Sequence, residues 1–219
     1  MKPVLSLIFS IFLFVLIAIV SLSFSNNHVK QVLDINGNPI SPSEKYYILP
    51  AIHEPYGGGV RLGKIHESEC EVSIFQDSNK LINGLPVKFN VSGLNPDIIF
   101  TGTPIEIEFT ERPNCAESPK WLIYVDDIIL KACVGIGGPE NYPSFKTWSG
   151  TFNIKKHESG FGYKLGFCKK DSSSCLDIGR YNNNEDQDGS RLILTHQVAY
   201  AVVFVDADLY EAGIVKSVA

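Results

Sequence analysis

The residues that could carry enzymatic or metal chemistry are scattered along this chain. The histidines are His28, His53, His66, His157 and His196, and no two of them have the spacing of metal ligands. The chain contains no Gly-x-Ser-x-Gly turn, which would present a serine nucleophile. The polar segment 182–189 lacks the terminal glutamate of a calcium-binding loop. We therefore expect no enzyme activity, no cofactor and no metal.

The five cysteines give more specific information. They are Cys70, Cys115, Cys133, Cys168 and Cys175, and none forms a Cys-x-x-Cys pair, which argues against a structural zinc site. Cys168 and Cys175 flank a short polar loop whose closure costs little entropy, so their spacing alone predicts a disulfide. Cys133 lies in an apolar run, which is typical of a buried and unreactive thiol. Disulfides are expected if the chain is exported to an oxidising compartment.

The first 25 residues have the pattern of a secretory signal peptide. Lys2 precedes the apolar stretch 4–20, and Ser23-Phe24-Ser25 fits the small-x-small pattern of a cleavage site. The alternative is an uncleaved signal anchor, but no basic cluster follows the apolar run, which favours cleavage. We therefore expect residues 1–25 to be a signal peptide and residues 26–219 to form a single domain. The mature protein would be secreted to the apoplast or delivered to the vacuole.

Composition narrows the functional class and the fold. The net charge of -5 and the pI near 5.5 argue against a nucleic-acid-binding protein, which needs a basic surface. With 44% hydrophobic and 20% charged residues, the chain is not of the intrinsically disordered type. It has 18 Gly, 12 Pro and 13 Phe but only one Met, a balance that favours a β-rich fold.

Short strands separated by turn residues are the dominant pattern along the chain. In Ile105–Phe109, three apolar residues alternate with two carboxylates, as expected of a half-buried strand. The spacing of the strands is that of an all-β barrel or sandwich, and no amphipathic helix of useful length is apparent. The predicted strands cover residues 46–49, 60–62, 71–76, 105–109, 121–125, 128–134, 151–154, 163–167, 192–195 and 198–205.

Several motifs in order resemble those of the plant Kunitz, or soybean trypsin inhibitor, family, miraculin-like members included. Val-Leu-Asp-Ile-Asn-Gly-Asn-Pro-Ile at 32–40, followed by Tyr-Tyr-Ile-Leu at 46–49, resembles the opening signature of that family. The resemblance runs from about Val32 to Asp208, nearly the whole mature chain. The further segments that carry it are 70–76, 109–121, 163–168, 175–179 and 188–192.

The resemblance implies a β-trefoil, in which three pseudo-repeats form a six-stranded barrel capped by three hairpins. It also implies disulfides Cys70–Cys115 and Cys168–Cys175, with Cys133 as the odd thiol. The implied activity is inhibition of secreted proteases, mostly serine endopeptidases, by an exposed loop that enters the protease cleft in a substrate-like shape. We accordingly expect a monomer that binds a secreted protease in plant defence, without nucleic-acid or membrane partners.

The resemblance places the reactive loop between the strands near 87–89 and 98–100, at Ser92, Gly93, Leu94, Asn95, Pro96 and Asp97. The acyl side of the target bond falls on Leu94 or Asn95, and neither is the basic residue that trypsin-directed relatives use against the buried Asp of the protease pocket. If the scissile bond followed Asn95, Pro96 would be the next residue, and a bond that precedes proline is a poor substrate for a serine protease. Leu94 is therefore the preferred residue, and it suits a chymotrypsin-like or elastase-like pocket.

Other features complicate this loop. Pro42 occupies the position of an Asn that braces the loop in the family. Proline lacks the side-chain amide, so either the brace is lost or Ser41 or Ser43 replaces it. Asn90-Val91-Ser92 is an N-glycosylation sequon, and a glycan there would hinder a protease.

Two alternatives to inhibition through this loop remain. Lys169 and Lys170, between the paired cysteines, offer a second reactive segment for a basic-specific protease. The other is a non-inhibitory storage or binding protein that kept the fold.

Overall fold

The computed structural model describes residues 29–51, 57–64, 66, 68–91, 97–172, 174–182 and 189–213. The chain divides into units 1–30 and 31–219, and the architecture below is that of the second. No helix among the described residues is long and apolar enough to cross a membrane. In chain order the elements are β1 (Tyr46–Pro50), β2 (Val60–Lys64), β3 (Glu71–Asp77), β4 (Val87–Asn90), β5 (Glu106–Phe109), β6 (Trp121–Asp126), β7 (Lys131–Ile136), η2 (Pro139–Asn141), β8 (Lys146–Trp148), β9 (Gly150–Lys156), β10 (Tyr163–Lys169), β11 (Cys175–Tyr181), β12 (Gly189–Thr195), β13 (Val202–Asp206) and α2 (Ala207–Glu211).

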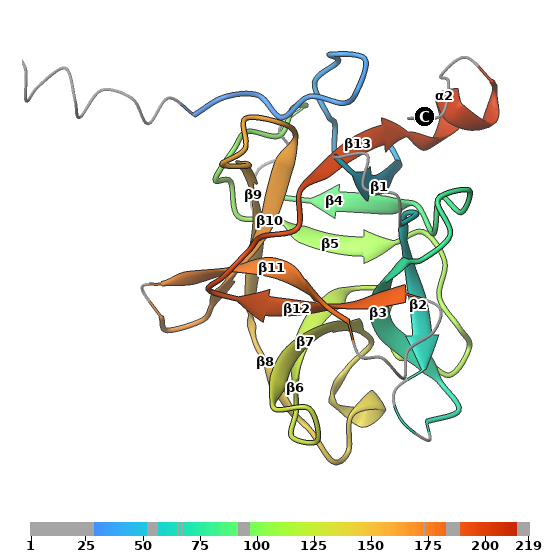
Figure 1. Cartoon of the computed structure of the whole chain (residues 1–219), viewed down its shortest axis with the longest axis vertical. Helices are drawn as coiled ribbons and strands as arrows, with labels where there is room; N and C mark the ends of the chain where they lie inside the picture. The colour runs from blue at the N-terminus through green and yellow to red at the C-terminus, as the bar shows by residue number, and fades with distance from the viewer. Residues whose placement is uncertain are drawn as a thin grey trace, which may run out of the picture. The chain divides into compact units, whose positions relative to one another are not determined.

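The strands β1, β4, β5, β9, β10 and β13, all labelled in Figure 1, pair in a closed ring. β1 lies between β13 and β4, β4 pairs with β5, and β10 pairs with both β9 and β13. The ring is completed by an antiparallel bridge between Ile105, just before β5, and Phe152 of β9. A closed ring leaves these strands without a free edge, which removes the template for edge-to-edge aggregation.

Three hairpins cover one end of this barrel: β2–β3, β6–β7 and β11–β12. Their inner strands β3, β7 and β12 pair with one another, at Ser73 with Gly135, at Cys133 with Ile193, and at Gln76 with Ser190. Each third of the chain therefore contributes a barrel strand, a hairpin and a second barrel strand. This arrangement is a β-trefoil, and it confirms the all-β fold with three pseudo-repeats.

The barrel interior is filled by aromatic and branched side chains, and in β4 and β5 buried residues alternate with partly exposed ones. In β5, Ile107 and Phe109 are buried whereas Glu106 and Glu108 reach the surface, as the alternation predicted. Phe204 of β13 packs edge-on against Phe89 of β4, with ring centroids 5.5 Å apart. Such offset aromatic pairs add about 0.5–1.5 kcal/mol each to the hydrophobic burial of their rings.

A buried ion pair links the β6–β7 hairpin to the β11–β12 hairpin. Asp126, at the end of β6, has a fully buried side chain, and its Oδ2 lies 3.0 Å from Nη1 of Arg191 and 2.9 Å from Nε2 of His66. Its Oδ1 accepts backbone N–H bonds from Ile128 and Ile129. A buried carboxylate is tolerated only when it is paired and hydrogen-bonded in this way.

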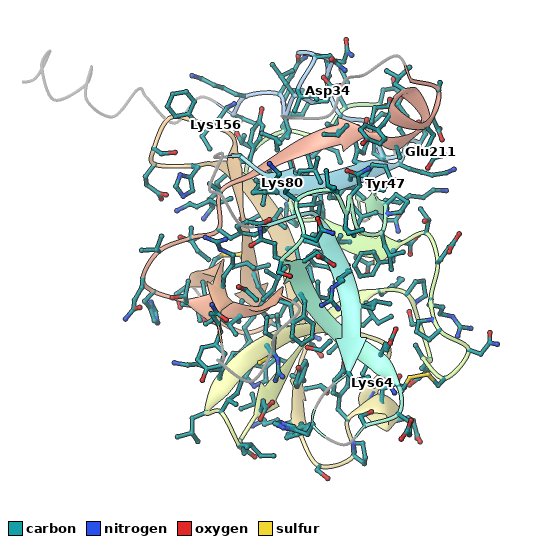
Figure 2. All side chains as sticks on the ribbon, turned by 45° about the vertical axis from the view of Figure 1, so that its right-hand side comes forward. Asp34, Tyr47, Lys64, Lys80, Lys156 and Glu211 are labelled. Carbon is teal, nitrogen blue, oxygen red and sulfur yellow. A yellow bond between two sulfur atoms is a disulfide. The ribbon has the colours of Figure 1, made fainter. Side chains whose placement is uncertain are left out.

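The C-terminal helix α2 packs on β1. Asp206 caps its N-terminus by accepting a 2.9 Å hydrogen bond from the backbone N–H of Leu209. Tyr47 of β1 donates a 2.9 Å hydrogen bond to the carboxylate of Glu211 (Figure 2). Burial and this bond raise the pKa of Tyr47 to about 12. Among the described residues, α2 is the only α-helix, and it has five residues.

Three predicted strands were misplaced. The predicted strand 128–134 begins with a turn, because the Asp126 carboxylate captures the N–H groups that a strand would use, and β7 starts at Lys131. The predicted strand 198–205 is irregular up to residue 201. The segment 98–100 forms a single bridge, between Phe100 and Gln31, and is not a strand. β8 was not predicted, and the pattern of apolar residues alone did not predict β11.

Both expected disulfides are formed. Cys70 is bonded to Cys115 across 45 residues, and Cys168 is bonded to Cys175 across 7. The second bridge joins register partners of β10 and β11, so it links residues that the strand pairing already holds close together. The first joins the entry of β3 to the chain between β5 and β6, which the sheet does not bring together by itself.

We predict that the two bridges differ in their contribution to stability. Loop entropy gives about 4 kcal/mol for the Cys70–Cys115 bridge and about 2.5 kcal/mol for the Cys168–Cys175 bridge. Urea unfolding of the paired Cys→Ser variants, followed by tryptophan fluorescence, measures both. Equal losses, or a larger loss for the Cys168–Cys175 variant, would contradict this ordering.

Candidate functional site

The predicted reactive loop leaves the barrel at the end of β4 and returns at the start of β5. Asn90 and Glu106 are the last register pair of these strands, so they form the base of the loop. Asp97 is exposed. The other predicted loop residues lie outside the described residues, and they are Ser92, Gly93, Leu94, Asn95 and Pro96.

The arm of the loop that returns to β5 is held by the opening segment of the chain. Ile99 is buried, and its N–H donates to the carbonyl of Ile40 at 3.0 Å. The carbonyl of Ile99 accepts from the N–H of Val32 at 2.9 Å. Further along, the N–H of Gly102 donates to the carbonyl of Ile154 in β9 at 2.8 Å. The arm therefore has backbone bonds on both sides only two residues after Asp97.

A carboxylate sets the shape of that opening segment. Asp34, labelled in Figure 2, is mostly buried, and its Oδ1 accepts from the N–H groups of Asn36 and Asn38, both at 2.8 Å. Its Oδ2 accepts from the side-chain amide of Asn38 at 3.2 Å. Gly37 in this turn has φ +85°, which glycine adopts without strain. The turn thus presents Ile40 and Val32 side by side to Ile99.

The turn around Pro42 has its own hydrogen bonds. Ser41 Oγ lies 2.8 Å from Ser43 Oγ, and the N–H of Ser41 donates to the hydroxyl of Tyr46 at 2.9 Å. The Tyr46 hydroxyl in turn donates to the carboxylate of Glu44, and burial followed by this bond raises the pKa of Tyr46. Any contact between these serines and the reactive loop involves residues outside the described part of the chain, so a replacement brace stays a prediction.

Of the glycosylation sequon at residues 90–92, the structure describes Asn90 and Val91. Asn90 ends β4 and is half-buried. Ser92, which completes the sequon, lies outside the described residues.

The alternative segment between Cys168 and Cys175 is a compact turn. The N–H of Ser172 donates to the carbonyl of Lys169 at 3.1 Å, and Asp171 has φ +65°. The ammonium of Lys169 lies 4.4 Å from the ring centre of Trp148. Lys170 is exposed. Lys169 ends the extended strand β10, and the left-handed residue of the turn is Asp171, so a reactive role for Lys169 or Lys170 stays a prediction.

The odd thiol is buried at the centre of the hairpin layer. Cys133 is fully buried in β7, where it pairs with Ile193 of β12, and it forms no disulfide. Burial raises the pKa of its thiol to about 12, a shift that nearby Arg191 partly offsets. Among the described residues, no group of three or more His, Cys, Asp or Glu could hold a metal ion.

Comparison with known proteins identifies the family. The family model described as "Trypsin and protease inhibitor", of the legume Kunitz type, matches residues 32–206. The chain belongs to the legume Kunitz inhibitor family.

Relatives extend this match over the full chain. A Kunitz-type trypsin inhibitor-like 1 protein of Pisum sativum is 59% identical over 218 residues, which is 100% of both chains. The subtilisin inhibitor CLSI-II of Canavalia lineata is 51% identical over 189 residues, or 86% of this chain and 98% of the relative. The crystal structure of a Kunitz type trypsin inhibitor from Cicer arietinum has a TM-score of 0.78 and 69% identity, covering 82% of this chain and 99% of that one.

Our first prediction for this Kunitz site concerns Asp34. Replacing Asp34 with Ala removes three hydrogen bonds from the turn that positions Ile40, and we expect it to lower the free energy of unfolding by about 1–3 kcal/mol. Amide exchange at Ile99 should accelerate with it. Asp97→Ala is the matched control, because that side chain is exposed. If the two variants exchanged alike at Ile99, the turn would not hold the loop.

A further prediction concerns Cys133. The native thiol should not react with Ellman's reagent at pH 8, and one thiol should react in denaturant. Because the folded thiol keeps its proton to about pH 12 whereas an unfolded thiol loses it near pH 8.5, the unfolded state binds fewer protons between these values. Stability should therefore fall as pH rises from about 8.5 to 10. In Cys133→Ala this decline should be shallower by up to about 1.4 kcal/mol per pH unit, and an unchanged slope would contradict the assignment.

Proposed function

We propose that the protein is a serine protease inhibitor that acts through the β4–β5 loop. The observation that carries the proposal is the match of the Kunitz inhibitor family to residues 32–206, which includes the loop and the segment that holds it. The hydrogen bonds of Ile99 to Ile40 and Val32 support it, because a fixed arm lowers the entropy lost when the loop binds a protease.

In this mechanism the protease supplies the catalytic groups, and the inhibitor supplies a loop with the backbone conformation of a substrate. The loop enters the cleft as a substrate would, with Leu94 on the acyl side of the target bond. The barrel strands β4 and β5 hold the two ends of the loop at the Asn90–Glu106 pair, so the backbone is placed before binding. No nucleophile, metal or cofactor of the inhibitor takes part.

We propose a target with an apolar primary pocket. Leu94 offers no charge to the buried Asp of a trypsin-like pocket, whereas a chymotrypsin-like pocket is a hydrophobic slot. The relative from Canavalia lineata is named a subtilisin inhibitor, which supports a target other than trypsin. The relatives from Pisum sativum and Cicer arietinum carry the word trypsin in their names, so trypsin belongs in the test.

We also propose export of the chain, removal of residues 1–25 and a role in plant defence as a glycoprotein monomer. The two disulfides support export, because such bonds persist in oxidising compartments. The sequon at Asn90 supports modification next to the loop.

A second candidate function is a storage or binding protein that has lost inhibition. Pro42 favours it, because the side-chain amide of the family's bracing Asn is missing there. A loop without a brace would be cut as a substrate and released.

The deciding experiment uses the mature chain 26–219 and measures inhibition of chymotrypsin, elastase, subtilisin and trypsin. We expect Leu94→Ala to weaken binding to the best target by about 30-fold to more than 100-fold, because an anchoring Leu buries surface for roughly 2–3 kcal/mol. Leu81→Ala is the matched control, since Leu81 is highly exposed and lies outside the β4–β5 loop. Leu94→Arg should move the preference toward trypsin.

Mass spectrometry of the incubated proteins separates the two candidate functions. An inhibitor stays largely intact or equilibrates slowly between intact and cut forms. Rapid cleavage beside residue 94 without lasting inhibition would rule out the inhibitor and favour the storage or binding protein. Trypsin inhibition that survives Leu94→Ala and Asn95→Ala would redirect attention to Lys169 and Lys170.

A further inference from the structure

A groove of about 460 Å³ lies in the hairpin layer, apart from the β4–β5 loop. Its lining includes residues 130–132, at the start of β7, and residues 193–198, at the end of β12 and just after it. Ala132, Ile193 and Leu194 contribute apolar side chains to its lining, and the last two are almost completely buried. Its size is within the range of pockets that bind ligands. Figure 1 shows β7 and β12 in this layer.

Two exposed apolar side chains line the groove from different elements. Leu130, in the β6–β7 turn, is 81% exposed, and Val198, after β12, is 82% exposed. Ile128, in the same turn as Leu130, is 68% exposed. Exposed apolar residues gathered around a groove are characteristic of interaction surfaces, whereas single ones need no explanation.

The conformation of the turn that carries Leu130 is fixed by its surroundings. Leu130 has φ +54°, a left-handed conformation that is costly for a bulky residue and persists only where the surroundings enforce it. The enforcing group is the buried Asp126, which accepts the N–H groups of Ile128 and Ile129 and is itself fixed by Arg191. The apolar side chains of this turn are thus presented by a rigid frame.

The segment that carries Val198 is also ordered. The N–H of Gln197 donates to the hydroxyl of Thr195 at 2.9 Å, and the N–H of Tyr200 donates to the carbonyl of Ile178 at 2.8 Å. Gly179 lets this segment pack against β11, because a Cβ there would lie 2.8 Å from the carbonyl oxygen of Val198. Both sides of the groove are therefore set before any partner binds, which lowers the entropic cost of binding.

The described residues that line the groove include three basic side chains. Lys131, Arg180 and His196 line it, and no described lining residue is acidic, although the chain carries a net charge of -5. The Nη1 of Arg180 donates to the Oε1 of Gln76 at 2.7 Å, and the guanidinium lies over the ring of Tyr200. These contacts hold Arg180 in place. Such a surface attracts carboxylates, and it disfavours a second copy that would bring the same basic groups face to face.

We propose that this groove binds an extended segment of another protein, in which an apolar side chain is flanked by acidic residues. The apolar side chain would lie between Leu130 and Val198, and the carboxylates would face Lys131, Arg180 and His196. A protein segment fits better than a small organic acid, because Ile128 lies outside the groove lining and only a longer ligand would cover it as well. The inference does not depend on the proposed inhibition.

The test uses the mature chain and fluorescein-labelled peptides in fluorescence polarisation. The first probe is Gly-Asp-Glu-Phe-Leu-Glu-Asp-Gly, and its controls replace the acids with Lys or the two apolar residues with Ser. We expect only the first probe to bind, and to bind more weakly as NaCl rises, because salt screens exposed charge pairs. Binding of the Lys peptide at equal strength, or of no peptide below 1 mM, would overturn the proposal.

Variants then locate the binding. Leu130→Asn removes the apolar side chain, and asparagine tolerates the left-handed conformation of this position. We expect this variant to weaken peptide binding about tenfold or more, and we expect the same of Lys131→Glu, which reverses a charge. The matched controls are Leu81→Ser and Lys146→Glu, whose exposed side chains lie outside the groove lining. Equal losses in groove and control variants would overturn the proposal.

Two other occupants are distinguished in the same series. If 4-phenylbutyrate bound as tightly as the peptide, the site would be one for small organic acids. If sedimentation velocity showed a dimer that Leu130→Asn dissolves, a second copy would occupy the groove. Either result would overturn the proposal of a partner segment. Protease inhibition should be the same in all groove variants, because none of the changed residues lies in the β4–β5 loop.

Discussion

The pairing of β1 with β13 is the contact on which the rest of the molecule depends. It joins Tyr46–Pro50 to Val202–Asp206 in five consecutive register pairs and so closes the barrel with strands from opposite ends of the sequence. The opening segment uses the same strand, since the N–H of Ile35 donates to the carbonyl of Phe204 at 3.0 Å. The turn at Asp34 and the arm at Ile99 are thus anchored, step by step, to a strand more than 100 residues away. Local sequence around the loop is not sufficient to hold it.

The sequence predicted those parts of the fold that depend on short-range pattern. Alternation located β5, because each of its side chains has one clear preference for core or solvent. The run Ile128-Ile129-Leu130 failed as a strand, because apolar composition does not reveal that the preceding Asp126 turns its carboxylate back onto the chain. The conformation of Leu130 follows from that buried group and not from its own propensity. The apolar pattern alone did not locate β11, because its apolar residues are interrupted by Asp177, Gly179 and Arg180.

The candidate site divides in the same way. The position of the loop and the pairing of Cys70 with Cys115 followed from resemblance to a family, since spacing alone does not choose among partners. The role of Asp34 was missed, although Asp-x-Asn-Gly-Asn is a turn signal, because the turn matters through the bonds of Val32 and Ile40 to Ile99, which is distant in sequence. The groove in the hairpin layer could not be read from sequence at all. It is made by Leu130 and Val198, which come together only when β7 and β12 pair.

The Cys70–Cys115 bridge has a consequence for a loop that is cut. Its two cysteines lie on either side of the β4–β5 loop, so hydrolysis of a bond beside Leu94 would leave the two pieces covalently joined. The pieces would also stay interleaved, because β1 pairs with β13 and β3 pairs with β12 across the break. The new carboxylate and amine would then face each other at a high effective concentration, as in an intramolecular reaction. Under those conditions peptide-bond synthesis competes with hydrolysis, and a protease bound to the cut loop can reseal it.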